Sequence, residues 1–98
     1  MEIIKTSEGG KLKIALEGRL DTNTAPELES ELKGGLDGVS ELEFDLEKLE
    51  YISSAGLRVL LSAQKVMNKQ GDMVVKTVSE EIMEVVEVTG FSDILTIE

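Results

Sequence analysis

The 98-residue chain contains no cysteine, no histidine and no tryptophan. Without cysteine, disulfides, thiolate nucleophiles and sulfur-ligated metal sites are excluded. Without histidine, the chain cannot build Ser-His or Cys-His catalytic pairs or imidazole metal sites. The sequence therefore predicts neither an ordinary hydrolase nor a metal centre.

Aromatic and basic residues are scarce. Phe44, Tyr51 and Phe91 are the only aromatic side chains, and 20 acidic residues outnumber 10 basic ones to give a formal net charge of −10. Such a chain lacks the stacking platforms and the positive surface that nucleic acid binding uses. We expect no nucleic acid partner, and we consider a basic protein or basic surface a better candidate.

Long apolar runs are also missing. No stretch approaches the ~20 residues of a membrane span, and the first residues, Met1 to Lys5, lack the basic and apolar regions of an export signal. We therefore expect a cytoplasmic protein that makes no membrane contact. The length suits a single domain that covers residues 1–98 and encloses one aliphatic core.

Hydrophobic periodicity predicts alternating strands and helices. The predicted strands are residues 3–4, 11–17, 42–46, 73–78 and 94–97. The predicted helices cover residues 25–36, the segment from Ser54 to Gly71, and the segment from Ser79 to Thr89. We expect Thr24 to cap the first helix through its side chain, with Glu27 completing a capping box. This order predicts an α/β domain with a mixed sheet of about five strands and three to four helices, packed as a single layer mainly on one face.

Two adjacent hydroxyls, Ser53 and Ser54, stand between a predicted strand and the longest predicted helix. A serine there can cap the helix, and a phosphate would also be favoured at a helix start. A helical wheel places five polar residues on one narrow stripe: Ser54, Arg58, Ser62, Lys65 and Lys69. No acidic residue occurs from Tyr51 to Gly71. Arg58 lies one turn beyond Ser54, so it could pair with an anion at the helix start.

Carboxylates are the remaining catalytic candidates. Asp21, Asp45 and Glu50 could in principle supply a paired acid and base. We favour the simpler interpretation that the acids of the third strand and its loop are solvated; these are Glu41, Glu43, Glu47 and Glu50. No spaced motif supports a magnesium or nucleotide site.

The run from Leu42 to Leu57 resembles the signature region of STAS domains, and specifically of bacterial anti-sigma factor antagonists. The segment Gly18-Arg19-Leu20-Asp21, followed by Thr24-Ala25, resembles a second landmark of that family. Residues 71–75 and 89–91 match later parts of it. The resemblance covers essentially the whole chain, and it implies a single STAS domain with a STAS-type sheet.

The resemblance implies a partner-switching function. In that family the serine two positions before the signature glycine, here Ser54 before Gly56, is phosphorylated by an anti-sigma factor that is also a serine kinase. The unphosphorylated antagonist binds the anti-sigma factor and thereby frees a sigma factor, and a separate phosphatase reverses the modification. The chain would then be a regulator of transcription, with no catalytic residue and no cofactor.

The sequence departs from the family at Ser53, where an aspartate is usual, so Ser53 is a rival acceptor. The residues that the resemblance implies for partner binding are Asp21, Thr22, Thr24, Ser53, Gly56, Leu57 and Arg58. An alternative is a STAS subunit that docks, without phosphorylation, on a lipid or anion transport complex. A helical carrier of a prosthetic group is a second alternative, but the strand periodicity and the missing Asp-Ser-Leu pattern count against it.

Overall fold

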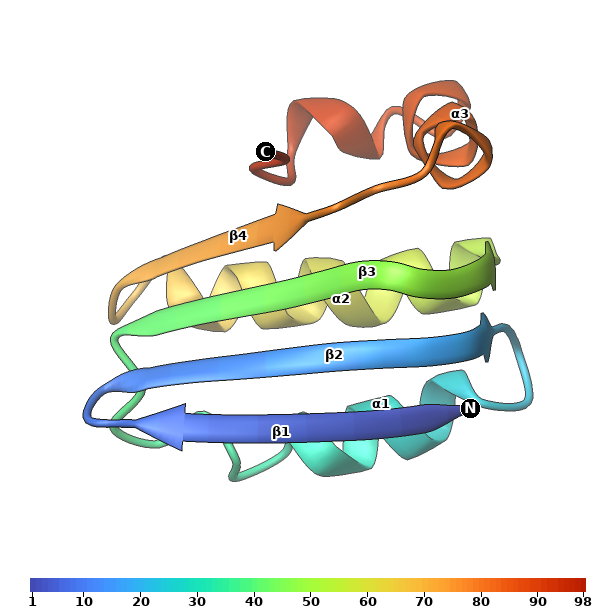
Figure 1. Ribbon diagram of the computed structural model, residues 1–98. Helices are drawn as coiled ribbons and strands as arrows, with labels where there is room; N and C mark the ends of the chain where they lie inside the picture. The colour runs from blue at the N-terminus through green and yellow to red at the C-terminus, as the bar shows by residue number, and fades with distance from the viewer.

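The computed structural model describes all 98 residues and shows one mixed sheet with the strand order β1-β2-β3-β4 (Figure 1). The elements are β1 (Glu2–Glu8), β2 (Lys11–Leu20), α1 (Ala25–Leu32), β3 (Glu41–Ile52), α2 (Ser54–Met67), β4 (Asp72–Lys76), α3 (Glu80–Val88) and a short 3₁₀ helix, η1 (Phe91–Asp93). β1 pairs antiparallel with β2, whereas β2, β3 and β4 are parallel. The predicted α/β class and mixed sheet are confirmed.

Helices cover one face of the sheet. α1 and α2 lie behind it in Figure 1, and α3 lies beyond the β4 edge. On β3, Leu42, Phe44 and Leu46 point toward the helices and are at most 1% exposed. Burial of each such side chain contributes about 1.5–3 kcal/mol to folding. The predicted single layer of helices mainly on one face is therefore confirmed.

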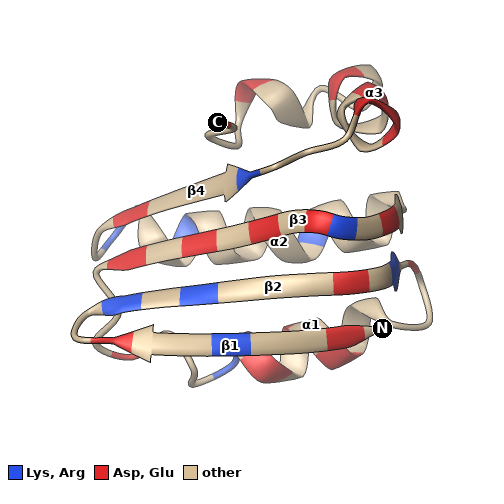
Figure 2. Cartoon of the chain, viewed as in Figure 1, with Lys and Arg blue, Asp and Glu red and all other residues tan.

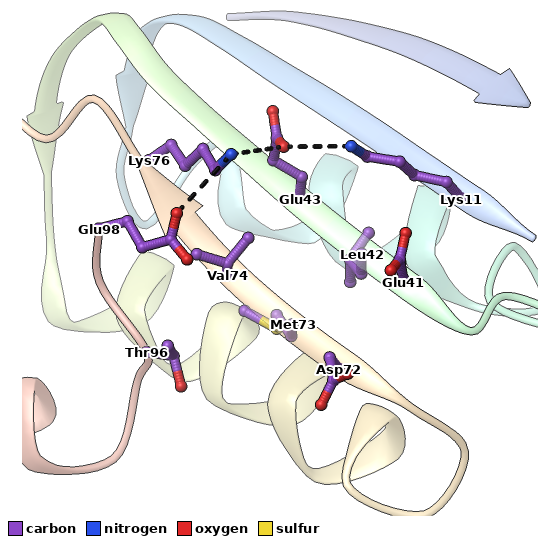
Figure 3. A pocket seen from close by; sticks show the side chains of 10 residues that line it. All are labelled: Lys11, Glu41, Leu42, Glu43, Asp72, Met73, Val74, Lys76, Thr96 and Glu98. Carbon is purple, nitrogen blue, oxygen red and sulfur yellow. Dashed lines mark ion pairs between the residues drawn. The ribbon is translucent and has the colours of Figure 1, made fainter.

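The other face of the sheet is open and carries ion pairs. Glu43 lies at its centre and is only 8% exposed, within reach of three lysines. Its carboxylate lies 3.7 Å from Lys11 Nζ and 3.3 Å from Lys76 Nζ (Figure 3). It also lies 3.8 Å from Lys13 Nζ. The contact with Glu43 is the main cause of a raised pKa of Lys76. The interpretation of Glu43 as a solvated acid is wrong, because the parallel pairing of β2, β3 and β4 surrounds it with lysines.

The first helix is shorter than predicted and is capped differently. α1 ends at Leu32 because Lys33 is extended and Gly34 takes a positive φ of 79°, which turns the chain away. The Thr24 side chain makes no cap hydrogen bond. Its hydroxyl instead donates to the carbonyl of Arg19 at 2.8 Å, so the predicted capping box is wrong. The hydrogen bonds of the turn between β2 and α1 therefore replace the cap.

The predicted fifth strand is also wrong. Residues 91–93 form η1, and only Ile97 bridges to Val75. Two backbone hydrogen bonds support this bridge, from Val75 N to Thr96 O and from Glu98 N to Val75 O. The turn continues into the predicted strand, because Ile94 has helical backbone angles and the Leu95 N–H donates to the Phe91 carbonyl at 2.9 Å.

No helix in the structure is both long enough and apolar enough to cross a lipid bilayer. The four-stranded sheet contradicts the helical carrier alternative.

Candidate functional site

The Ser53-Ser54 junction meets the loop after β2 at one end of the sheet. β2 and β3 are parallel, and Leu20 is paired with Ile52 at their carboxyl ends. The Ser53 backbone N–H donates to the Leu20 carbonyl at 2.9 Å, so the two loops are joined directly. α1 and α2 both begin at this end (Figure 1), and their positive dipole ends favour an anion there.

The two serines have different roles in the structure. Ser53 is the N-cap of α2, extended at φ −103° and ψ 172°, and its hydroxyl accepts the Gly56 N–H at 3.4 Å. It is half-buried. Ser54 is the first residue of α2, is exposed, and makes no side-chain hydrogen bond. The capping role therefore falls to Ser53, and the Ser54 hydroxyl is left available.

Of the two serines, we expect only Ser53 to contribute measurably to the stability of the fold. We expect Ser53→Ala to lower the free energy of unfolding by about 1 kcal/mol, because the Gly56 N–H loses its acceptor. Ser54→Ala is the matched control and should change it by less than about 0.5 kcal/mol. Urea denaturation of the unphosphorylated proteins measures both values. A larger loss in Ser54→Ala than in Ser53→Ala would show that the capping assignment is wrong.

Gly56 and Leu57 are buried. A Cβ at Gly56 would lie 2.5 Å from Leu20 Cγ, so the glycine lets the first turn of α2 approach the end of β2. Leu57 is 0% exposed. Neither residue therefore offers a side chain to a partner. The residues predicted for partner binding that are exposed or half-buried are Asp21, Thr22, Thr24, Ser53 and Arg58.

Asp21 and Thr24 hold the β2–α1 turn through reciprocal hydrogen bonds. Asp21 Oδ1 accepts the backbone N–H groups of Asn23 and Thr24 at 3.0 and 3.1 Å, and Thr24 Oγ1 accepts the Asp21 N–H at 2.8 Å. The hydrogen bond from the Thr24 N–H is the main cause of a lowered pKa of Asp21, because it stabilises the ionised carboxylate. Thr22 is exposed at the tip of this turn.

Arg19 and Tyr51 border the same end of the sheet and were missed by the sequence predictions. They are paired across β2 and β3, and the Arg19 guanidinium lies 4.3 Å from the centroid of the Tyr51 ring. Arg19 Nε also lies 3.7 Å from Asp21 Oδ2. Exposed Arg and Tyr are frequent anchors of protein interfaces. The sequence could reveal this pair only through the register between β2 and β3, and that register shifts twice before Arg19.

The polar stripe predicted on α2 is confirmed. All five of its residues are exposed; four lie on α2, and Lys69 lies just past its last residue, Met67. Basic positions are visible on α2 in Figure 2. α3 carries acidic residues and no basic ones, so positive charge gathers on α2.

The structure offers little for a metal or a small ligand. No three acidic side chains lie close enough together to hold a metal ion. The largest hollow, about 400 Å³, lies on the open face of the sheet around Glu43 (Figure 3). Its two lysines, Lys11 and Lys76, already face Glu43, so neither is free to bind an anion. The hollow is also near the start of β3, at the opposite end of that strand from Ser54.

Comparison with known proteins assigns the family. The family model described as Mlab, STAS domain, matches residues 4–96. This chain is a STAS domain. A Bordetella bronchiseptica protein whose assigned name is anti-sigma factor antagonist BtrV is 36% identical over 99% of this chain and 85% of its own length. The anti-sigma-B factor antagonist of Staphylococcus aureus is 29% identical over 97% of this chain and 90% of its own length.

Solved STAS structures share the fold. An anti-sigma factor antagonist from Mycobacterium paratuberculosis superposes with a TM-score of 0.88 at 22% identity, covering 98% of this chain and 83% of that one. The antagonist SpoIIAA, solved unphosphorylated, superposes with a TM-score of 0.77 at 15% identity, covering 99% and 87%. The phosphorylated form of SpoIIAA, from Bacillus, superposes with a TM-score of 0.76 at 15% identity, covering 99% of this chain and 91% of that one. At these identities the likeness establishes the STAS fold of this chain.

Proposed function

We propose that this STAS protein is an anti-sigma factor antagonist whose binding to an anti-sigma factor is switched off by phosphorylation of Ser54. Two relatives with 36% and 29% identity over nearly the whole chain carry that name. The assignment of Ser54 as the phosphate acceptor rests on the different roles of the two serines in the structure. Ser53 is engaged as the helix cap, whereas Ser54 presents a free hydroxyl.

The local environment favours a phosphate on Ser54. A phosphoserine adds about −1.5 to −2 charges and three acceptor oxygens. At the first residue of α2 these would face unpaired backbone N–H groups and the positive end of the helix dipole. Arg58, one turn further along, makes no ion pair within the chain. The fold should therefore tolerate the modification.

The loss of partner binding follows from the same position. Asp21, Thr22 and Thr24 lie beside the Ser53-Ser54 junction, because Ser53 is bonded to Leu20. A partner that contacts this surface meets a neutral hydroxyl at Ser54 in the unphosphorylated state. A dianion placed there must be desolvated or repelled, and either effect weakens binding. The switch would thus act at the interface, with little change in the fold.

The proposed cycle needs two further proteins. An anti-sigma factor with serine kinase activity would transfer phosphate to Ser54, and a serine/threonine phosphatase would remove it. The protein itself would act in the cytoplasm as a substrate and binding partner, without catalysis of its own.

Docking on a lipid or anion transport complex is less well supported. A sulfate transporter family protein from Wolinella succinogenes shares the fold, with a TM-score of 0.77 at 18% identity. The relatives with higher identity are named as antagonists.

Phosphorylation can be mapped directly. We expect incubation with the cognate anti-sigma factor and ATP to place one phosphate on Ser54, located by tandem mass spectrometry of the peptide that contains both serines. Ser53→Ala should still be phosphorylated, whereas Ser54→Ala should not. Phosphate on Ser53, or none on either serine while the kinase modifies a control substrate, would refute the assignment.

A further inference from the structure

A groove runs between α1 and α2, from the Ser54 end toward the opposite end of the sheet. It consists of two hollows of about 240 and 160 Å³ that share Glu29, Val59 and Ser62 and are therefore continuous. The near hollow includes Thr22 and Arg58. The far hollow is mainly apolar, and its remaining lining residues are Leu32, Lys33, Leu36, Ala63 and Val66.

Val66 is an exposed apolar side chain in the far half of the groove. Its exposed fraction is 43%. The neighbouring apolar residues of the groove are buried, so they form a floor and Val66 stands at the rim. An exposed aliphatic side chain beside an apolar hollow is the kind of feature that a docked helix covers.

Unpaired positive charge follows the groove. Six of the ten basic side chains form ion pairs within the chain: Lys5, Lys11, Lys13, Arg19, Lys48 and Lys76. The four without one are Lys33, Arg58, Lys65 and Lys69. Lys33 and Arg58 line the groove, and Lys65 and Lys69 continue the exposed stripe of α2. In a chain with a net charge of −10, the cations left without partners thus lie together.

We propose that this groove docks an acidic amphipathic helix of the anti-sigma factor, as a second contact region beyond the Ser54 end. This inference rests on the proposed function. A helix laid between α1 and α2 would seat its apolar side chains against Val66 and the groove floor, and would direct its carboxylates to the α2 cations. Arg58 and Lys65 are seven residues apart on α2, or roughly 10 Å, which matches about two turns of such a helix, and Lys69 lies just past the end of α2. Glu29 is the one acid on the groove wall, so the acidic side of the docked helix faces α2.

A second copy of this chain is the competing occupant. Its α3 carries Glu80, Glu84 and Glu87 together with Val88, which is 81% exposed. That contact would join two different surfaces, so a symmetric dimer would have to make it twice, once in each direction. The net charge of each copy also opposes it.

Two matched pairs of variants test the docking site by titration calorimetry with the cognate anti-sigma factor. Lys69→Glu should weaken binding about fivefold at ~0.1 M salt and less at high salt, because screening removes the electrostatic part. Its control is Lys48→Glu, which makes the same change of charge in β3, on a side chain that is 69% exposed. Val66→Asp should weaken binding about tenfold, and its control is Val88→Asp on α3. Both controls should bind like the wild type.

The outcomes separate this inference from the proposed function. Wild-type levels of binding in Lys69→Glu and Val66→Asp, with binding still abolished by Ser54→Asp, would overturn the docking site alone. Absence of any anti-sigma factor binding by the wild-type protein would overturn both proposals. Self-association in light scattering that both Val66→Asp and Val88→Asp abolish would assign the groove to a second copy instead. Thermal unfolding of each variant near the wild-type temperature shows that the fold is retained.

Discussion

Ser54→Asp is expected to weaken binding to the anti-sigma factor by roughly 100-fold while leaving the melting temperature within a few degrees of the wild type. The two effects separate because of where Ser54 lies. An acidic side chain at the first residue of α2 interacts favourably with the helix dipole, so the folded state loses nothing. The same charge on the exposed surface at the start of α2 would meet a partner that binds a neutral hydroxyl. Titration calorimetry and thermal unfolding on the same sample measure both quantities.

The matched controls for this prediction are Ser54→Ala and Ser53→Asp. Ser54→Ala should bind like the unphosphorylated protein and remain bound in the presence of kinase and ATP. Ser53→Asp keeps a side chain that can cap α2, and it adds one charge next to the acceptor position. We expect it to bind more tightly than Ser54→Asp. A fall in melting temperature that parallels the loss of binding in Ser54→Asp would instead indicate a structural role for Ser54.

Gly71→Ala is expected to destabilise the fold by about 3 kcal/mol or more, and to lower the melting temperature by roughly 12 °C or more. A Cβ at Gly71 would overlap the carbonyl oxygen of Ser40 and lie 2.7 Å from its carbonyl carbon. That carbonyl accepts the Asp72 N–H at 3.0 Å, the hydrogen bond at the start of β4. Because backbone atoms make the clash, no side-chain rotation relieves it. Differential scanning calorimetry measures the loss.

Gly10→Ala is a matched control for the same joint. A Cβ at Gly10 would meet Ser40 Oγ at 2.6 Å, which is the end of a side chain that can rotate away. The main link there, from Ser40 N to Gly10 O at 2.8 Å, uses backbone atoms only and would persist. We expect a loss below about 1 kcal/mol. Equal losses in Gly10→Ala and Gly71→Ala would contradict the account of Gly71 as a backbone contact.

Local patterns predicted most of the secondary structure. The helix predicted from Ser79 forms as α3, and the Ser79 hydroxyl caps it by accepting the Ile82 N–H at 3.3 Å. The stripe on α2 also follows from the sequence, because helical periodicity fixes which residues share a face. The failures occurred where a contact outside the predicted element decided the outcome. Thr24 is bound to Arg19 instead of capping α1, and the last predicted strand is reduced to a bridge at Ile97.

The candidate site was partly predictable. The pair Ser53-Ser54 and the acid-free helix behind it were evident in the sequence, and phosphorylation of Ser54 remains a prediction. The Arg19–Tyr51 stack was not evident, because it depends on a register that shifts between Ala15 and Glu17 and again between Gly18 and Arg19. Such shifts move a side chain to another neighbour or face without any change in local pattern.

The sequence by itself determined the α/β class, the alternation of strands and helices, the absence of histidine and cysteine chemistry, and the positive stripe of α2. These features depend on composition, capping residues and periodicity, which act between near neighbours. Tertiary structure alone decided that Ser53 caps α2 while Ser54 stays free, because the Leu20 carbonyl binds Ser53 N–H and fixes where the helix begins. It also decided that Glu43 lies among three lysines and that α1 and α2 leave a groove. Those outcomes require contacts between residues about twenty or more positions apart, whose geometry is set by strand pairing and helix packing.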